Sequence, residues 1–137
     1  MGTRPAFAAH VEREFLLAFW KLHILHHASE EPVVGQWIIR ELRRHGYDVS
    51  PGTLYPLLAR MRARGWLRLS VDPGGGLRAR REYTITPGGR SILAMLRRQV
   101  EELHREVVLG EEDPPPPTGA DTRAAPRARR RRKPGAW

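Results

Sequence analysis

The sequence predicts a mainly α fold with one small β-hairpin, and two kinds of pattern support this prediction. Four stretches repeat apolar residues every three or four positions, which is the period of an amphipathic helix. After the third stretch, two short runs alternate apolar and polar residues on either side of a glycine cluster, as expected of two antiparallel strands. We therefore expect a domain over residues 1–86 that ends in the hairpin, a helix over 87–110, and a tail over 111–137.

The composition limits the class of protein. The chain has 137 residues, 40% of them hydrophobic, which is enough for one modest domain. No apolar run could span a membrane and no secretory signal is recognisable, so a cytoplasmic location is expected. The absence of cysteine excludes disulfides, thiolate metal sites and a cysteine nucleophile. A net charge of +9 favours nucleic acid, or less often an anionic membrane surface, as the partner.

The first helix is expected over residues 7–28. Its apolar residues recur at spacings of four and three, as in a coiled-coil seam, at Val11, Phe15, Ala18, Leu22 and Leu25. Other residues widen this stripe into a second face, namely Leu16, Phe19, Trp20 and His23. A helix that is apolar on two sides has two partners, which we take to be its own core and a second subunit, although a wholly buried helix would have the same pattern.

Two further helices are separated by a short turn. The first is expected over 33–45 with Gly46 at its end, and the second begins after Ser50 and stops at Gly65. Ser50 is expected to accept a hydrogen bond from a free backbone N–H, and Pro51 suits the first helical position. Two helices joined by a short glycine-containing turn, the second with a basic face, are typical of a helix-turn-helix.

The helix after Ser50 is the expected DNA recognition helix. One face is apolar and should pack on the core, through Leu54, Leu57, Leu58 and Met61. The opposite face carries Thr53, Tyr55, Arg60, Arg62 and Arg64. Hydrogen-bonding groups near the N-terminus and guanidinium groups further along suit a helix that enters a major groove N-terminus first. Pro56 either bends this helix and turns Tyr55 outward, or ends a separate first turn.

A hairpin follows this helix. Residues 66–71 and 80–86 alternate, with Leu67, Leu69 and Val71 sharing one face of the first run and Arg81, Tyr83 and Ile85 one face of the second. The connection over 72–79 is rich in glycine and is flanked by arginines, which is typical of a wing that follows a DNA groove. A phosphate-cradling loop of an enzyme is disfavoured, because no Gly-Lys-Ser/Thr sequence accompanies the glycines.

The last helix is expected to begin with Thr86 as its cap and to run to about residue 109. Its apolar residues keep a heptad-like spacing between charged flanks, so we expect it to pack on the first helix of a second subunit, or alternatively on its own domain. The residues expected at the dimer interface are Val11, Phe15, Leu22, Leu93, Leu96, Val100, Leu103 and Val107.

The segment over 111–137 is Pro-rich, then Arg-rich, and is expected to be a disordered tail that adds salt-sensitive DNA contact.

Three motifs of this chain occur together: Ser50-Pro51-Gly52-Thr53-Leu54-Tyr55-Pro56-Leu57-Leu58, Gly65-Trp66-Leu67 and Arg80-Arg81-Glu82-Tyr83-Thr84-Ile85-Thr86-Pro87-Gly88-Gly89. With these motifs the chain resembles the PadR family of bacterial transcriptional regulators. The resemblance implies a winged helix-turn-helix domain with a C-terminal dimerisation helix of the short subgroup. It also implies a repressor that leaves its operator when a small molecule binds. By the same resemblance, the start of the recognition helix and the wing contact DNA.

These observations predict a homodimeric repressor, not an enzyme, that binds double-stranded DNA at a pseudo-palindromic operator. The DNA-binding residues are expected to be Ser50, Gly52, Thr53, Tyr55, Arg60, Arg64, Arg78, Arg80 and Arg81. A small aromatic or apolar effector is expected near Phe19, Trp20 and Met95. No cofactor or metal is expected.

Two alternatives stay open. The winged fold also serves protein-interaction adaptors that do not bind DNA. The spacing of His23, His26 and His27 would also let two of them share a metal in a sensor, although such histidines more often lie on a half-buried helix surface.

Overall fold

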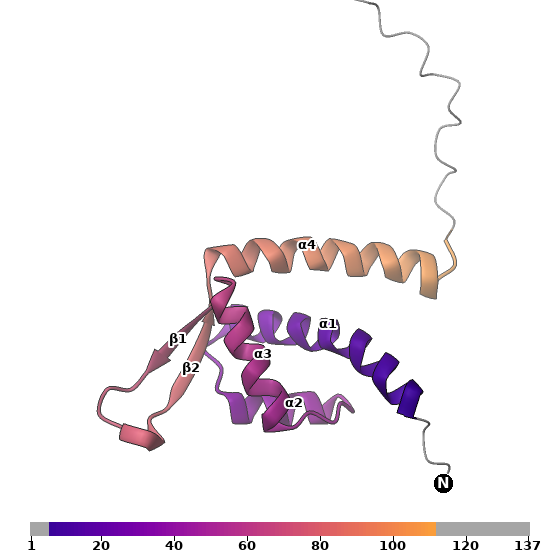
Figure 1. Ribbon diagram of the computed structural model, residues 1–137. Helices are drawn as coiled ribbons and strands as arrows, with labels where there is room; N and C mark the ends of the chain where they lie inside the picture. The colour runs from indigo at the N-terminus through magenta and orange to yellow at the C-terminus, as the bar shows by residue number, and fades with distance from the viewer. Residues whose placement is uncertain (1–5, 112–137) are drawn as a thin grey trace, which may run out of the picture. The chain divides into compact units, whose positions relative to one another are not determined.

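The computed structural model describes residues 6–111, with side chains from Glu12 onward. The elements in chain order are α1 (Ala6–Glu30), α2 (Gly35–Arg44), α3 (Pro51–Ala63), β1 (Leu67–Val71), the 3-10 turn η1 (Gly76–Arg78), β2 (Arg81–Ile85), α4 (Pro87–Leu103) and the π-helical turn η2 (His104–Val108) (Figure 1). The chain divides into two units, the first ending at Glu102 and the second beginning at Leu103. The predicted mainly α fold with one hairpin is confirmed.

The segment before α2 differs from the prediction. The helix begins at Gly35, two residues later than expected, because Val33 forms a bridge with β2 instead. The Val33 N–H donates to the Tyr83 carbonyl at 3.0 Å, and the Tyr83 N–H donates back at 2.7 Å. This isolated β-bridge ties the link between α1 and α2 to the hairpin.

Both glycines predicted to end helices do so. Gly46 has φ +88° and Gly65 has φ +77°, a backbone region that glycine enters without steric cost. After α2 the Tyr47 N–H donates to the Leu42 carbonyl at 3.0 Å, and after α3 the Trp66 N–H donates to the Met61 carbonyl at 3.0 Å. These six-to-one hydrogen bonds define Schellman caps, which turn the chain sharply at both points.

The N-terminus of α3 has no side-chain cap. The Leu54 N–H donates to the Ser50 carbonyl at 3.0 Å, whereas the Ser50 hydroxyl donates to Thr53 Oγ1 at 3.2 Å. The predicted side-chain cap by Ser50 is therefore wrong. The helix continues through Pro56 without a break, so the idea of a separate first turn is also wrong.

The core lies where α1, α2 and α3 meet the hairpin. All four residues of the predicted apolar stripe of α3 are buried: Leu54, Leu57, Leu58 and Met61. They pack with residues of α1 and α2 such as Ile24, Leu25, Ile38 and Leu42.

The hairpin pairs Leu67 with Ile85 and Val71 with Arg81 at its two ends (Figure 1). Leu67 is buried and Leu69 packs on the core, whereas Val71, two residues further along the same strand, is exposed. The strand has already left the core by that residue. The hairpin thus extends away from the helices and carries η1 at its tip.

The predicted start of α4 is confirmed. The Gly89 N–H donates to Thr86 Oγ1 at 2.9 Å, and the Thr86 hydroxyl donates to the Gly65 carbonyl. One side chain thus caps α4 and ties it to the end of α3.

In residues 6–111, no helix is long and apolar enough to cross a membrane. The predicted disordered tail, apart from Glu111, lies outside the described residues.

Candidate nucleic-acid interface

The start of α3 presents several hydrogen-bonding groups. Ser50 and Gly52 are exposed, and Thr53 is half-buried. An Arg13 N–H from α1 donates to Thr53 Oγ1 at 3.3 Å. Sequence reasoning missed Arg13, because 40 residues separate it from Thr53 and no local pattern links the two positions. Arg13 thus adds a guanidinium group to the three residues at the start of α3 that are predicted to bind DNA.

A groove of about 600 Å³ runs along this start of the helix. It joins α1, the turn between α2 and α3, and the first turn of α3. Its lining residues are Glu12, Arg13, Leu16, Trp20, Gly46, Tyr47, Asp48, Ser50 and Thr53. The positive end of the α3 dipole adds to the charge of Arg13 at the start of the helix, while two carboxylates, Glu12 and Asp48, also line the groove.

Tyr55 connects α3 to the wing. Its ring lies against α2, since a Cβ atom on Gly35 would come within 2.6 Å of Tyr55 Cε1. The side chain is nevertheless 38% exposed. It lines a hollow of about 490 Å³ together with Val34, Gly35, Gln36, Leu77, Ala79, Arg80 and Arg81. The structure therefore brings Tyr55 together with two of the three predicted wing arginines.

The wing and the later turns of α3 carry exposed guanidinium groups. Among the described residues, no carboxylate forms an ion pair with the predicted DNA-binding arginines Arg60, Arg64, Arg78 or Arg81. Arg80 differs, because its Nε donates to Glu82 Oε1 at 2.8 Å. Arg64 stacks over the Trp66 ring at 5.1 Å. Arg60 and Arg64 line neither of the two hollows and lie further along α3.

Of the three residues predicted to bind an effector, only Trp20 lines the groove beside the start of α3. Trp20 is buried, meets Tyr47 edge to face at 6.4 Å, and lines the groove beside the start of α3. Phe19 and Met95 are exposed and do not line that groove. Within residues 12–111, the Trp20 Nε1–H has no hydrogen-bond partner although it is buried.

The predicted dimerisation residues fall into two groups. Leu93 is buried in the core of its own chain, and Leu22 and Leu96 pack against that core. Phe15, Val100, Leu103 and Val107 are exposed by 64%, 43%, 51% and 69%. The side chain of Val11 lies outside the described residues.

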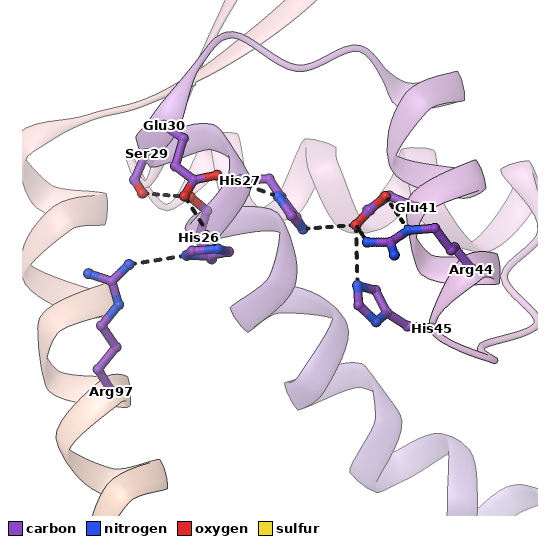
Figure 2. A network of polar contacts seen from close by, with 8 residues as sticks. All are labelled: His26, His27, Ser29, Glu30, Glu41, Arg44, His45 and Arg97. Atoms are coloured by element: carbon purple, nitrogen blue, oxygen red, sulfur yellow. Dashed lines mark hydrogen bonds and ion pairs between the residues drawn. The ribbon is translucent and has the colours of Figure 1, made fainter.

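A histidine cluster lies between α1 and the end of α2 (Figure 2). Glu41 is at its centre, and the hydrogen bond from Arg44 is the main cause that lowers the pKa of this carboxyl to about 2. Burial is the main cause that lowers the pKa values of His23 and His27 below that of free imidazole, and neighbouring histidines lower them further. Burial thus favours the uncharged form of both imidazoles, in which a ring nitrogen can act as a ligand.

Two helices joined by a tight turn, followed by a hairpin with an exposed basic loop, define a winged helix-turn-helix protein. Residues 24–95 match the model of the transcriptional regulator PadR-like family. The chain is 54% identical over 99 residues to the transcriptional regulator Rv3488 of Mycobacterium tuberculosis, across 72% of this chain and 92% of that relative. The chain belongs to the PadR-like family of transcriptional regulators.

Solved structures agree with this assignment. A PadR-like transcriptional regulator from Bacillus cereus is 27% identical and superposes with a TM-score of 0.62, over 72% of this chain and 99% of the other. A PadR-like transcription factor from Bacteroides fragilis is 26% identical with a TM-score of 0.63, over 74% and 99% of the two chains.

Proposed function

We propose that this chain is a homodimeric repressor in the cytoplasm that binds a pseudo-palindromic operator. Each copy of α3 would enter one of two successive major grooves, about 10 base pairs apart. One observation carries this proposal: exposed hydrogen-bonding groups at the start of α3 adjoin a wing that is rich in guanidinium groups. In the described residues Arg78 and Arg81 of this wing form no ion pair with a carboxylate, whereas Arg80 is paired with Glu82. Base edges and phosphates are the chemistry that such groups fit.

The contacts would divide by type. Ser50, Gly52, Thr53 and Tyr55, at the start of α3, are placed for base edges and nearby backbone, because the early residues of a recognition helix reach deepest into the groove. The remaining predicted residues are guanidinium groups that suit phosphates: Arg60, Arg64, Arg78, Arg80 and Arg81. Arg13 joins this second group, since it lies beside the free N–H groups at the start of α3.

Exposed apolar side chains support the dimer. Phe15 and Phe19 on α1, and Met95 and Val100 on α4, are each more than 40% exposed. Large apolar residues gathered on two helices are costly in water and are typical of a protein interface. In this proposal Leu93 serves its own core, and the exposed residues make the contact with the second subunit.

A small aromatic or apolar effector would bind near Phe19, Trp20 and Met95. Its binding would cause the protein to release the operator. Buried Trp20 supports this position, since its Nε1–H has no partner in the described residues and would donate to a polar atom of a ligand. Titration with candidate compounds should quench tryptophan emission in the wild type and not in Trp20→Phe. An unchanged response in the variant would place the effector elsewhere.

The test of DNA binding begins with sequencing DNA fragments that the purified protein captures from a random pool. Affinity for a captured fragment is then measured by fluorescence anisotropy over a range of salt concentrations. Arg81 is a cleaner probe than Arg80, because Arg80 is paired with Glu82. We expect Arg81→Ala to reduce the salt slope by about one unit. Arg98→Ala on α4 is the control and should leave the slope unchanged. Failure to capture any sequence would contradict the proposal.

A further inference from the structure

Two pairs of side chains with metal-ligand chemistry face each other across α1 and α2. His23 and His27 are four residues apart on α1, and Glu41 and His45 are four residues apart at the end of α2. This spacing puts both members of a pair on one face of the helix. The ligand atoms of the three histidines all lie within 4.8 Å of one another. Glu41 Oε1 lies 3.7 Å from His27 Nε2 and 3.2 Å from His45 Nε2 (Figure 2).

The four donor groups match one class of metal ion. Imidazole nitrogen suits Zn²⁺ and neighbouring divalent transition metals, and three imidazoles with one carboxylate complete a tetrahedral shell. In such a shell, with metal–nitrogen distances of about 2.0–2.1 Å, neighbouring ligand atoms are about 3.3 Å apart. In the structure the ligand atoms of the three histidines lie within 4.8 Å of one another, and Glu41 Oε1 lies 3.2 Å from His45 Nε2 and 3.7 Å from His27 Nε2. Binding would therefore draw these side chains closer together.

His27 also carries an unsatisfied atom at the centre of the cluster. Its Nε2 is buried and forms no hydrogen bond within the described residues. The nearby Glu41 oxygen, at 3.7 Å, is too distant for one. Buried polar atoms without partners are uncommon in native proteins, so each calls for an explanation. A metal ion between the two helices would provide this atom with its partner.

Arg44 does not prevent this arrangement. It donates from Nε to Glu41 Oε2 at 3.1 Å and from Nη2 to Glu41 Oε1 at 2.6 Å. An ion bound to Oε1 would displace only the second of these hydrogen bonds. The first would remain and would orient the carboxylate from outside the metal shell, as second-shell groups do in known metal sites.

We propose that His23, His27, His45 and Glu41 form a site for a divalent transition metal of the zinc class that links α1 to the end of α2. A second group, His26, His27 and Glu30, has ligand atoms equally close together. It is less suited, because adjacent residues such as His26 and His27 do not share a helix face. It also belongs to a single helix, so a metal bound there would tie no elements together.

Metal binding has a consequence for the recognition helix, and this part rests on the proposed DNA-binding function. His45 immediately precedes Gly46, where the chain turns toward Ser50 and α3. A metal that holds His45 and Glu41 against α1 would fix the end of α2 and thereby the start of α3. We therefore expect Zn²⁺ to change the affinity for DNA.

The site is tested on the full, untagged chain after treatment with EDTA and dialysis. Competition with a chromophoric chelator should give one tightly held Zn²⁺ per chain. His45→Gln should weaken this binding at least tenfold, and it should leave the circular dichroism spectrum unchanged because His45 is exposed. With Co²⁺, the wild type should give the strong visible absorption of a tetrahedral site, and His45→Gln should lose it.

His26→Gln is the matched control, since it removes an imidazole from the same cluster and belongs only to the second group. It should change the Zn²⁺ affinity less than twofold. Equal affinities of the wild type and His45→Gln would overturn the proposal, and so would a loss confined to His26→Gln and Glu30→Gln.

The regulatory part has its own measurement. Affinity for a captured DNA fragment should change at least threefold when one equivalent of Zn²⁺ is added to the wild type, and should not change in His45→Gln. An unchanged affinity in the Zn²⁺-loaded wild type would refute the link to α3. If the protein bound no DNA at all, the proposed function would fail, while the chelator titration would still decide the metal site.

Discussion

Tyr55 combines contact with its own protein and exposure to a partner. Its ring lies against Gly35, yet more than a third of its side chain is exposed beside the wing. We expect Tyr55→Ala to reduce the affinity for a captured fragment by about tenfold or more, as the loss of a base contact does, and to reduce random-sequence binding much less. Fluorescence anisotropy with both DNAs measures the difference. Equal losses would show that Tyr55 does not read bases.

Gly35 sets the position of the Tyr55 ring. A Cβ atom at Gly35 would come within 2.6–2.8 Å of the ring and hydroxyl, so Gly35→Ala must turn the ring away. Because only the end of a side chain is displaced, the fold should be kept, with a cost below about 1 kcal/mol. We expect Gly35→Ala to weaken specific DNA binding in the wild type but not in a Tyr55→Ala background. Additive losses of affinity would refute the coupling.

Residues of the candidate interface could be predicted where one helix decides their position. The apolar stripe of α3 fixed which face is buried, and so Thr53 and Tyr55 were expected on the other side. Arg13 was not predicted, because its contact with Thr53 depends on how α1 packs near α3. The role of the Ser50 hydroxyl was mispredicted for a local reason, since Thr53, three residues later, offers a competing acceptor.

At the scale of elements, α4 packs against the turn that follows α3. Gly89 of α4 makes the close contact, since a Cβ atom there would come within 2.1 Å of the Trp66 carbonyl oxygen and 2.8 Å of Ile85 Cγ1. Both a backbone atom and a packed side chain resist displacement. We expect Gly89→Ala to lower the free energy of unfolding by about 1–3 kcal/mol, measured by urea denaturation.

The neighbouring glycine is the matched control for this prediction. A Cβ atom on Gly88 would meet the Gly65 carbonyl oxygen at 3.4 Å, which is ordinary contact. Gly88→Ala should therefore leave stability unchanged or raise it by up to about 1 kcal/mol, because alanine restricts the unfolded chain. A similar loss in both variants would mean that α4 simply tolerates no side chain in its first turn.

Elements were predicted more reliably than the contacts between them. The glycine stops after α2 and α3 follow from local backbone preference, so their positions were confirmed. The start of α2 was misplaced, because Val33 has a strand partner 50 residues later. Likewise, only the half of the histidine cluster on α1 was recognisable, since Glu41 and His45 reach it only after α1 and α2 have packed.

At the scale of the whole molecule, the exposed apolar residues of α1 and α4 are the feature that a lone chain does not explain. The heptad-like spacing of α4 predicted an apolar stripe. It did not predict which of these residues pack in the core of the same chain and which stay exposed for a second subunit. The structure assigns Leu93 to the core of its own chain and leaves Val100 43% exposed. Only packing against the earlier helices could distinguish these two residues, because they have the same place in the repeat.

Val100 therefore gives a direct test of the dimer. Val100→Glu should not disturb the fold of one chain, because the side chain is already exposed. In a dimer interface, however, it would place a charge in apolar surroundings, which costs several kcal/mol. We expect this variant to sediment as a monomer at micromolar concentration. It should also lose most of its affinity for a captured two-half-site fragment, because each half-site alone binds weakly.

The control for this experiment is Gln99→Glu, which introduces the same charge at the adjacent exposed position of α4. Adjacent residues point in different directions on a helix, so this variant should remain dimeric and bind DNA nearly as the wild type does. If both variants stay dimeric, the interface lies elsewhere on the molecule. If Val100→Glu is monomeric but binds the fragment with full affinity, operator recognition does not require two coupled copies of α3, and the proposed spacing of about 10 base pairs loses its basis.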